Sequence, residues 1–359
     1  MISKKHKFLI YFSLQIIFIT VIKCANIGSD TSVDRFTTQQ ILYNGDRVAT
    51  FAALDAGFKI DNSSATGTFD SVFPVSGDIE LNSGTLEITN DILLDSTAEI
   101  ITFGNITGNN HTFEMSRSTT GLRCTGTNKN ITASDITLIL NSDIEIKDCQ
   151  LNFDGNATIN GRGNSISFSE TGAIKILSNA SLLMKDVIIK DLNNTKIENV
   201  DSTSTMTVQN VTFVLCDDFS FNNGQLNIKD ECKIYGQGYT FSYQSTSSST
   251  ICENSKLILQ DNTTFCYDPT NESKTLITMD SKSSQIILNG ATLHTTKGIE
   301  LTKGTMVVNN NSSIINDSVT TENAIIFGDG SSSSNNFDIQ WKPAACLDIG
   351  TGKVINDNV

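Results

Sequence analysis

Apolar residues recur along the chain in short alternating runs that are separated by Asn, Asp and Gly. The stretch SQIILNGATLHTT at 284–296 has the same rhythm as SKLILQDNTTFCY at 255–267 and ASLLMKDVIIKDL at 180–192. A period of two is typical of β-strands with one buried face, and Asn, Asp and Gly between such runs are typical of tight turns. The pattern predicts many short strands joined by polar turns.

An internal repeat supports this interpretation. Shifting the chain against itself so that Gln150 meets Gln225 aligns 150–186 with 225–261 without a gap, and 12 of the 37 positions are identical. A fainter copy of the glycine turn lies in the stretch ITGNNHTFEM. We expect the shared turn glycines to have structural roles, at tight corners that need positive φ. These glycines are Gly108, Gly161, Gly163, Gly236 and Gly238.

The spacing of the apolar anchors predicts how the strands are arranged. Anchors recur at Leu151, Ile159, Ile166, Ile174, Leu182 and Ile189, so that every third anchor begins a new period of the pattern. Three short strands in a period of about 23 residues are what one coil of a three-sided solenoid needs, because each strand then pairs with its equivalent one coil away. We predict an all-β parallel solenoid with about three short strands per coil, capped ends and roughly ten coils.

Other repeat folds have different sequence patterns. A β-propeller would need four strands in about 40–45 residues, and a leucine-rich repeat would need a helix or a Leu-Asn pattern in each unit. Neither pattern is present. A β-sandwich stays open as an alternative, because short alternating strands occur in both architectures.

The ends of the chain differ from its centre. Three lysines precede an apolar run at 8–22, which predicts a signal peptide over 1–25 and no stable membrane span after its removal; an uncleaved anchor is the alternative. We expect an N-terminal cap region over 26–75 with a helical face at Phe36, Ile41 and Leu42, β-helix repeats over 76–325, and a C-terminal coil and cap over 326–359.

Composition narrows the set of partners. The formal net charge is −14, which makes nucleic acid a poor partner, whereas a neutral glycan or a protein surface is compatible with it. The eight cysteines contain no Cys-x-x-Cys pair and no metal-ligand spacing. We therefore assign no cofactor and no metal site. Calcium stays possible through Asp329 in the stretch GDG, although no repeated cation-binding motif accompanies it.

The chain resembles a known fold family. TGAI at 171–174 resembles the Gly-Gly-Ala-Ile repeat of polymorphic outer-membrane proteins, and FSFN at 219–222 resembles their Phe-x-x-Asn repeat. Over about 76–345 the chain is similar to right-handed parallel β-helix proteins of the pectin-lyase-like fold, including autotransporter passengers, without their membrane barrel. The resemblance implies a right-handed β-helix that serves either adhesion or polysaccharide cleavage.

The polysaccharide-cleaving members of that fold use clustered carboxylates. The only pair that this chain offers in the matching form is Asp217 and Asp218, and the Gly-His-Gly and Arg-x-Lys motifs of the polygalacturonase branch are absent. Adjacent strand residues point to opposite faces, so the two carboxylates could share a substrate only at a bend. We therefore assign no catalytic residue, and we interpret Arg162 as a turn residue and His294 as structural.

Three functions follow from these observations. The first is an exported, non-catalytic solenoid, secreted, periplasmic or at the cell surface, that recognises a glycan or a host or cell-surface protein. The second is a polysaccharide lyase or glycoside hydrolase of the pectin-lyase fold. The third is a structural component of a surface layer. The sequence leaves the oligomeric state open.

Overall fold

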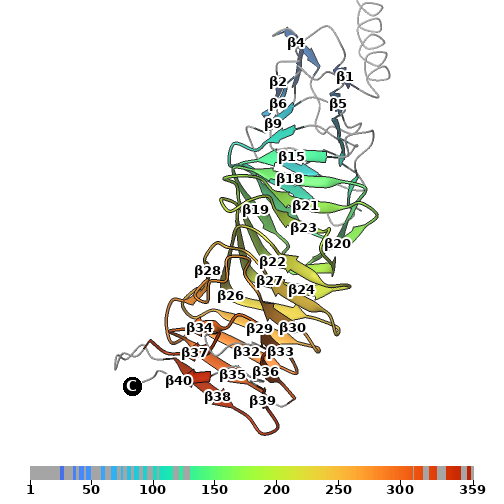
Figure 1. Cartoon of the computed structure of the whole chain (residues 1–359). Helices are drawn as coiled ribbons and strands as arrows, with labels where there is room; N and C mark the ends of the chain where they lie inside the picture. The colour runs from blue at the N-terminus through green and yellow to red at the C-terminus, as the bar shows by residue number, and fades with distance from the viewer. Residues whose placement is uncertain are drawn as a thin grey trace, which may run out of the picture.

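The computed structural model is an all-β solenoid whose parallel strands are stacked along one axis (Figure 1). It describes residues 105–115, 130–309, 311–317, 323–329 and 337–348, together with the backbone of further strands between 25 and 102, at 121–123 and at 354–356. The predicted signal peptide lies outside the described residues apart from Ala25. The described part contains strands and no helix, which confirms the predicted fold class.

Each coil has three sides, so the strands form three faces that the chain visits in a fixed order. The first face contains β2 (Arg35–Thr37), β6 (Thr66–Asp70), β9 (Thr85–Ile88), β12 (Asn105–Thr107), β15 (Asn130–Ser134), β18 (Gln150–Asp154), β21 (Ala173–Ile176), β23 (Ile197–Asn199), β25 (Phe219–Phe221), β27 (Thr240–Tyr243), β30 (Thr264–Tyr267), β33 (Thr292–Thr295), β36 (Ser313–Asn316) and β39 (Cys346–Asp348). Its ladder is split into two sheets, one ending at β23 and the other starting at β25.

The other two faces share three long strands, β22 (Ser181–Leu192), β24 (Thr205–Leu215) and β26 (Gln225–Tyr235). The second face also contains β7 (Pro74–Val75), β10 (Ile92–Leu94), β13 (Thr112–Met115), β16 (Thr137–Leu140), β19 (Asn156–Asn160), β28 (Ser249–Ile251), β31 (Ile277–Met279), β34 (Ile299–Leu301), β37 (Ile325–Phe327) and β40 (Val354–Asn356). The third contains β1 (Ala25–Ile27), β5 (Phe58–Ile60), β8 (Ile79–Leu81), β11 (Ile100–Thr102), β14 (Gly121–Arg123), β17 (Ile144–Lys147), β20 (Ser165–Ser169), β29 (Lys256–Gln260), β32 (Gln285–Asn289), β35 (Thr305–Val308) and β38 (Asp338–Trp341).

The three long strands cover two faces because each one bends at a single residue. Asp186, Asn210 and Asp230 have φ of 49°, 53° and 53°. Asp and Asn tolerate this left-handed conformation better than other residues with a side chain. One such residue therefore turns the chain from the second face to the third without a loop.

Pairing register confirms the predicted period and shows where it varies. Leu151 pairs with Ile174, the anchor predicted to be its equivalent one coil later. The coil that brings Ala133 onto Phe153 is shorter, and the coil that brings Met306 onto Ile339 is longer. The differences arise at the corners, where loop length is free as long as the strands stay aligned.

The core is a continuous column of inward-pointing side chains, as the alternating burial of each strand requires. On the first face β25, β27 and β30 supply two ladders of buried aromatic rings. Centroid separations are 5.1 and 5.7 Å in the ladder of Phe219, Phe241 and Phe265. They are 5.8 and 5.8 Å in the ladder of Phe221, Tyr243 and Tyr267. These separations are in the range of favourable ring pairs.

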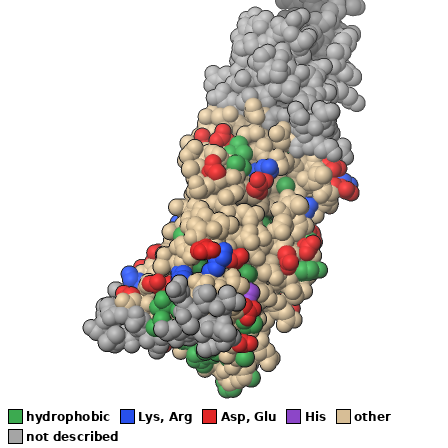
Figure 2. Space-filling model, in the orientation of Figure 1, with side chains coloured by type: hydrophobic (Ala, Val, Ile, Leu, Met, Phe, Trp, Pro, Cys, Tyr) green, Lys and Arg blue, Asp and Glu red, His purple; other side chains and the backbone are tan. Residues whose placement is uncertain are grey.

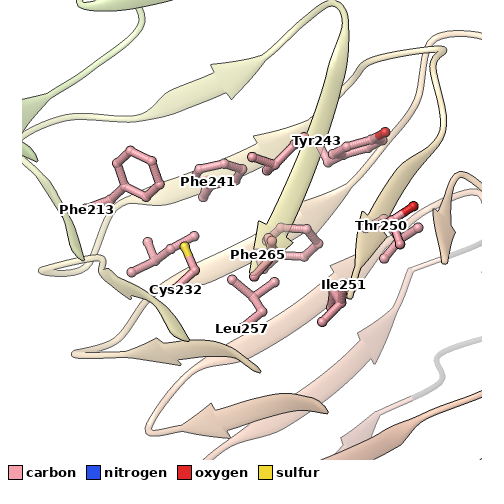
Figure 3. Close-up of a pocket in the computed structure, with 12 residues that line it drawn as sticks. Phe213, Cys232, Phe241, Tyr243, Thr250, Ile251, Leu257 and Phe265 are labelled. Carbon is pink, nitrogen blue, oxygen red and sulfur yellow. The ribbon is translucent and has the colours of Figure 1, made fainter. Parts of the chain in front are cut away.

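The interior has no room for a ligand beside these rings. Figure 3 shows Phe241 and Phe265 facing Cys232 and Leu257 across a void of about 20 Å³ with an apolar lining. Roughly 10–15 Å³ of such volume is the least that holds one water, and a water also needs polar partners. Ligand binding by this part of the chain must therefore use the outer surface.

The N-terminal strands already belong to the stack. β1 pairs in parallel with β5, and β3 (Gln40–Tyr43) pairs antiparallel with both β2 and β4 (Asp46–Ala49). The helical face expected at Phe36, Ile41 and Leu42 is therefore wrong, since these residues lie in β2 and β3. Their apolar spacing fits a short hairpin as well as a helix. At the other end β38, β39 and β40 pair with the preceding coil.

Candidate functional site

A polar hollow of about 260 Å³ lies on the outer surface, at the corner between the first and second faces. Four successive coils contribute to it, from the turn before β13 to the beginning of β22. The lining residues are Asn110, Asp135, Ile136, Thr137, Asn156, Ala157, Thr158, Ser181 and Leu183. We call this site the corner hollow.

Backbone geometry fixes the carboxylate of the corner hollow. Asp135 turns the corner with φ of 48°, and its Oδ1 accepts the backbone N–H of Asn156 at 3.0 Å. Gly155, with φ of 72°, makes room for this contact, because a Cβ there would lie 2.7 Å from the same oxygen. The Asp135 carboxylate is thus held against the next coil, and its Oδ2 atom takes no part in the hydrogen bond to Asn156.

Pairing between coils sets the other groups of the hollow in a row. Thr137 pairs with Thr158, and Thr158 pairs with Leu183, so equivalent outward positions lie one coil apart. Neighbouring parallel strands are about 4.8 Å apart. This row holds two threonine hydroxyls and the apolar Leu183. Neighbouring positions add the amides of Asn110 and Asn156 and the hydroxyl of Ser181, all of which can donate and accept hydrogen bonds. The described lining residues include one carboxylate and no Lys or Arg.

The visible face of the molecule is mostly uncharged, with acidic and basic side chains scattered over it (Figure 2). A surface of this kind has no concentrated positive field that would attract a polyanion.

The predicted turn glycines lie in three turns of the same geometry. In each turn the fourth residue donates its backbone N–H to the first glycine, at 2.8 Å for Gly108, Gly161 and Gly236. The third position has positive φ, 87° at Gly163 and 91° at Gly238. In the fainter copy Asn110 takes that position with φ of 65°.

The first glycine of each turn serves a different purpose. Its φ is outside the left-handed region, and what matters is the approach of the next coil. A Cβ on Gly161 would lie 2.6 Å from the carbonyl oxygen of Asp186, and a Cβ on Gly236 would lie 2.4 Å from the Cα of Thr263. Gly108 is equally close to Asp135, at 2.5 Å from its carbonyl oxygen.

Asp217 and Asp218 lie in the exposed turn between β24 and β25. The Oδ1 atom of Asp217 accepts the backbone N–H of Asp218 at 2.8 Å, and Oδ1 of Asp218 accepts that of Thr240 at 2.8 Å. Each carboxylate therefore stabilises backbone of its own turn or of the next coil. Neither residue lines the corner hollow.

Arg162 occupies the second position of its turn and reaches back over two coils. Its Nη1 donates to Oε1 of Glu114 and to Oδ1 of Asn141, both at 2.6 Å. This exposed ion pair joins three coils at their surface. In the residues that the structure describes, no group of three or more His, Cys, Asp or Glu side chains could hold a metal ion.

The structure also brings together three residues that are far apart in the sequence. Cys266, His294 and Asp317 come from successive coils and form a chain of polar contacts on the first face. His294 has no His or carboxylate partner nearby in the sequence, which predicts a structural role. Register supplies the partner, since Cys266 in β30 pairs with His294 in β33.

Comparison with known proteins adds no family to this description: no protein-family model, no curated protein and no solved structure matches the chain. The structure defines the class, a parallel β-solenoid. Within the described strands and turns, no helix is long and apolar enough to span a bilayer.

Proposed function

We propose that the chain is an exported β-solenoid that binds an extended neutral glycan, with the corner hollow as its main contact, and that it holds the polymer there without cleaving it. The observation that carries this proposal is the hollow itself. It presents Asn, Thr and Ser side chains from four consecutive coils around a single carboxylate.

The chemistry of the hollow favours a sugar over other ligands. Sugar hydroxyls donate and accept hydrogen bonds, as do the amide and hydroxyl groups that line the hollow. The net charge of −14 and the carboxylate of Asp135 disfavour nucleic acids and polyuronates. The volume of about 260 Å³ is slightly below the roughly 300 Å³ at which small-molecule pockets begin, so the hollow suits one short section of a longer polymer.

Binding without cleavage follows from the same residues. Most glycoside hydrolases need two carboxyl groups about 5–9.5 Å apart on either side of the scissile bond. The described lining has only Asp135, and one of its oxygens already accepts a backbone N–H. A relation to pectin-lyase-like proteins and autotransporter passengers, together with export, belongs to the proposal. It is supported by the solenoid fold and the N-terminal sequence pattern.

The test compares two arginine substitutions in the full chain. Thr158→Arg fills the hollow, whereas Thr212→Arg places the same side chain on the third face, at another outward strand position. The protein is made in a host without N-glycosylation, because Asn156 begins an Asn-x-Thr acceptor. Affinity gel electrophoresis then measures retention by neutral polysaccharides and by polygalacturonate.

We expect a neutral polysaccharide to retain the wild type and Thr212→Arg but not Thr158→Arg, and we expect polygalacturonate to retain the wild type weakly. Equal retention of both variants would show that the hollow is not the site. Release of new reducing ends would support the polysaccharide-cleaving alternative. If no polysaccharide retains the wild type, the proposal is wrong.

A further inference from the structure

Three side chains on the first face form a continuous chain from a thiol to a carboxylate. Sγ of Cys266 lies 3.6 Å from Nδ1 of His294, and Nε2 of His294 lies 2.9 Å from Oδ2 of Asp317. In β30 the neighbours Phe265 and Tyr267 are buried, so Cys266 points outward. The side chain of His294 is 24% exposed and that of Asp317 is 60% exposed, so small molecules can reach this cluster.

The contacts define which nitrogen of His294 carries the proton. An ionised carboxylate only accepts hydrogen bonds, so Nε2–H of the neutral imidazole donates to Asp317. Nδ1 then has a lone pair directed at the thiol and accepts its S–H. A nucleophile, a base and a carboxylate that orients the base are the elements of a catalytic triad.

We propose that Cys266 is a nucleophile that accepts acyl groups from activated esters and thioesters, with His294 as its general base and Asp317 as a positioning residue. This activity is separate from glycan binding, because the cluster lies several coils away from the corner hollow along the solenoid axis. It adds a second, chemical function to the outer surface.

The reaction balances with water as the only co-reactant. His294 Nδ1 takes the thiol proton while Sγ attacks the carbonyl carbon, and an S–C bond forms. Collapse of the tetrahedral intermediate breaks the bond to the leaving group, which takes the proton from Nδ1. Water, deprotonated by His294, then attacks the thioester; the S–C bond breaks and the thiol regains its proton. An ester yields an acid and an alcohol, and a thioester yields an acid and a thiol.

The surrounding sheet limits the substrate class. β30 lies between β27 and β33 and pairs with both, so the backbone N–H and C=O groups around Cys266 are already used in hydrogen bonds between the strands. Backbone N–H groups of this strand therefore cannot bind an oxyanion, an interaction that commonly contributes a factor of about 10²–10³ to rate. Substrates with good leaving groups depend least on it, so aryl esters and thioesters should react and amides should not.

Electrostatics determine how the thiol is activated. Burial, and then the negative charge of Asp268, raise the pKa of the Cys266 thiol. Lys297, whose Nζ lies 3.2 Å from Oδ1 of Asp268, balances part of that charge. The resting form is therefore the thiol, and reaction requires His294 to remove the proton during attack. Loss of His294 should slow acylation more than it would at a cysteine that is already ionised.

Cys346 provides an internal control in the same molecule. It is a free, exposed cysteine at the end of the solenoid, in β39. In the wild type at neutral pH, Cys266 should be acylated faster than Cys346 although it is less exposed. Mass spectrometry of peptides from the acid-quenched protein measures both rates in one sample, after reaction with p-nitrophenyl acetate or with the acetyl thioester of N-acetylcysteamine.

Variants then test the roles of the partners. His294→Ala should slow acylation of Cys266 by about 10²–10⁴-fold and leave Cys346 unchanged. Asp317→Asn should slow acylation of Cys266 by a smaller factor. It should also lower the pH at which the acylation rate is half-maximal, because the imidazolium that forms on His294 loses a stabilising charge. Asp317→Glu should restore both the rate and this pH. Circular dichroism verifies folding, and His294→Gln replaces His294→Ala if the latter does not fold.

Two results would overturn the proposal. One is faster acylation of Cys346 than of Cys266 in the wild type, which requires no variant. The other is an unchanged rate at Cys266 in folded His294 variants. Because glycan retention is measured separately and depends on Thr158, neither result bears on glycan binding.

Discussion

The two glycines of the turn at 161–164 allow a direct test of how closely the coils are packed. Gly161→Ala adds a Cβ 2.6 Å from the carbonyl oxygen of Asp186, whereas Gly163→Ala adds one with no atom within 4 Å. The two substitutions add the same methyl group to the same turn. The methyl group at position 161 collides with the next coil, whereas the one at position 163 touches nothing and only makes the positive φ of that residue unfavourable.

The structure gives the size of each effect. Restoring an ordinary contact of 3.4 Å at Gly161 requires the next coil to move by about 0.8 Å, the difference from 2.6 Å. That shift lengthens the hydrogen bond from Gly161 N–H to Lys185 and the one from Gly163 N–H to Asp186, now 2.8 and 2.6 Å. Overpacking of about 1–3 kcal/mol and weakened bonds give a loss of about 2–4 kcal/mol.

The substitution at Gly163 should cost less. Its φ of 87° is unfavourable for Ala, by about 1–2 kcal/mol, and restriction of the unfolded chain offsets roughly half of that. Gly163→Asn should cost less again, because Asn110 already has φ of 65° at the equivalent position. We therefore expect stability to fall in the order wild type, Gly163→Asn, Gly163→Ala, Gly161→Ala.

Urea unfolding followed by far-ultraviolet circular dichroism measures this order. Repeat arrays need not unfold in one step, so both the midpoint and the slope are compared between variants of this one turn. Equal losses for Gly161→Ala and Gly163→Ala would refute the argument, since the coils would then be loose enough to accept a methyl group between them.

Three further substitutions test the core and the acid response. Phe241→Ala removes the middle ring of a stack with separations of 5.1 and 5.7 Å and should cost about 3–5 kcal/mol in the same urea titration; a loss below about 1 kcal/mol would contradict close packing. Tyr267→Phe leaves the buried N–H of Leu276 without the hydroxyl that accepts it at 3.1 Å, so about 1–3 kcal/mol should be lost, and unchanged stability would show that another acceptor replaces it. Hydrogen bonds led by that from Ser178 lower the pKa of Asp201 from 3.8 to about 2, so its stabilising effect is present above pH 3.8 and is lost as the pH falls toward 2. Asp201→Asn should flatten the stability profile in that window, and an unchanged acid profile would argue against these bonds.

The strand and turn pattern was predictable because it is local. Inward and outward positions alternate within each strand, and positive φ restricts certain turn positions to Gly, Asn or Asp. The helical face predicted at Ile41 and Leu42 failed for a related reason. The three apolar residues Phe36, Ile41 and Leu42 fit two short strands as well as one helix, and only the pairing of β3 with β2 and β4 distinguishes the two.

The cluster on the first face was not predictable from spacing. Aligned from their starts, the stretches at 255–267 and 284–296 place Cys266 opposite Thr295. In the structure Cys266 pairs with His294, because the turn before β33 is one residue shorter than the turn before β30. Aligning TFCY with TLHT directly would have shown the pair. Asp317 lies beyond any strand, so its position depends on the corner loop that follows β36.

The sequence by itself determined the repeating unit of this protein. That unit is one short strand, which forms one side of a coil, followed by a tight corner that only a few residue types can form. It did not determine which face each unit occupies. The two repeat copies, which start at Gln150 and Gln225, are ten sides apart, where a side is one strand of a coil. Strands β18 to β21 are four of these sides, and the two halves of β22 and of β24 are four more. Strands β23 and β25 are the remaining two. Ten sides are three coils and one side, so Gly161 lies between the second and third faces and Gly236 between the third and first. All three sides need the same local pattern, alternating burial followed by a tight corner. The sequence of one side therefore does not show which of the three faces it occupies. The face depends on the accumulated length of every corner before it, and only the tertiary structure decides that sum.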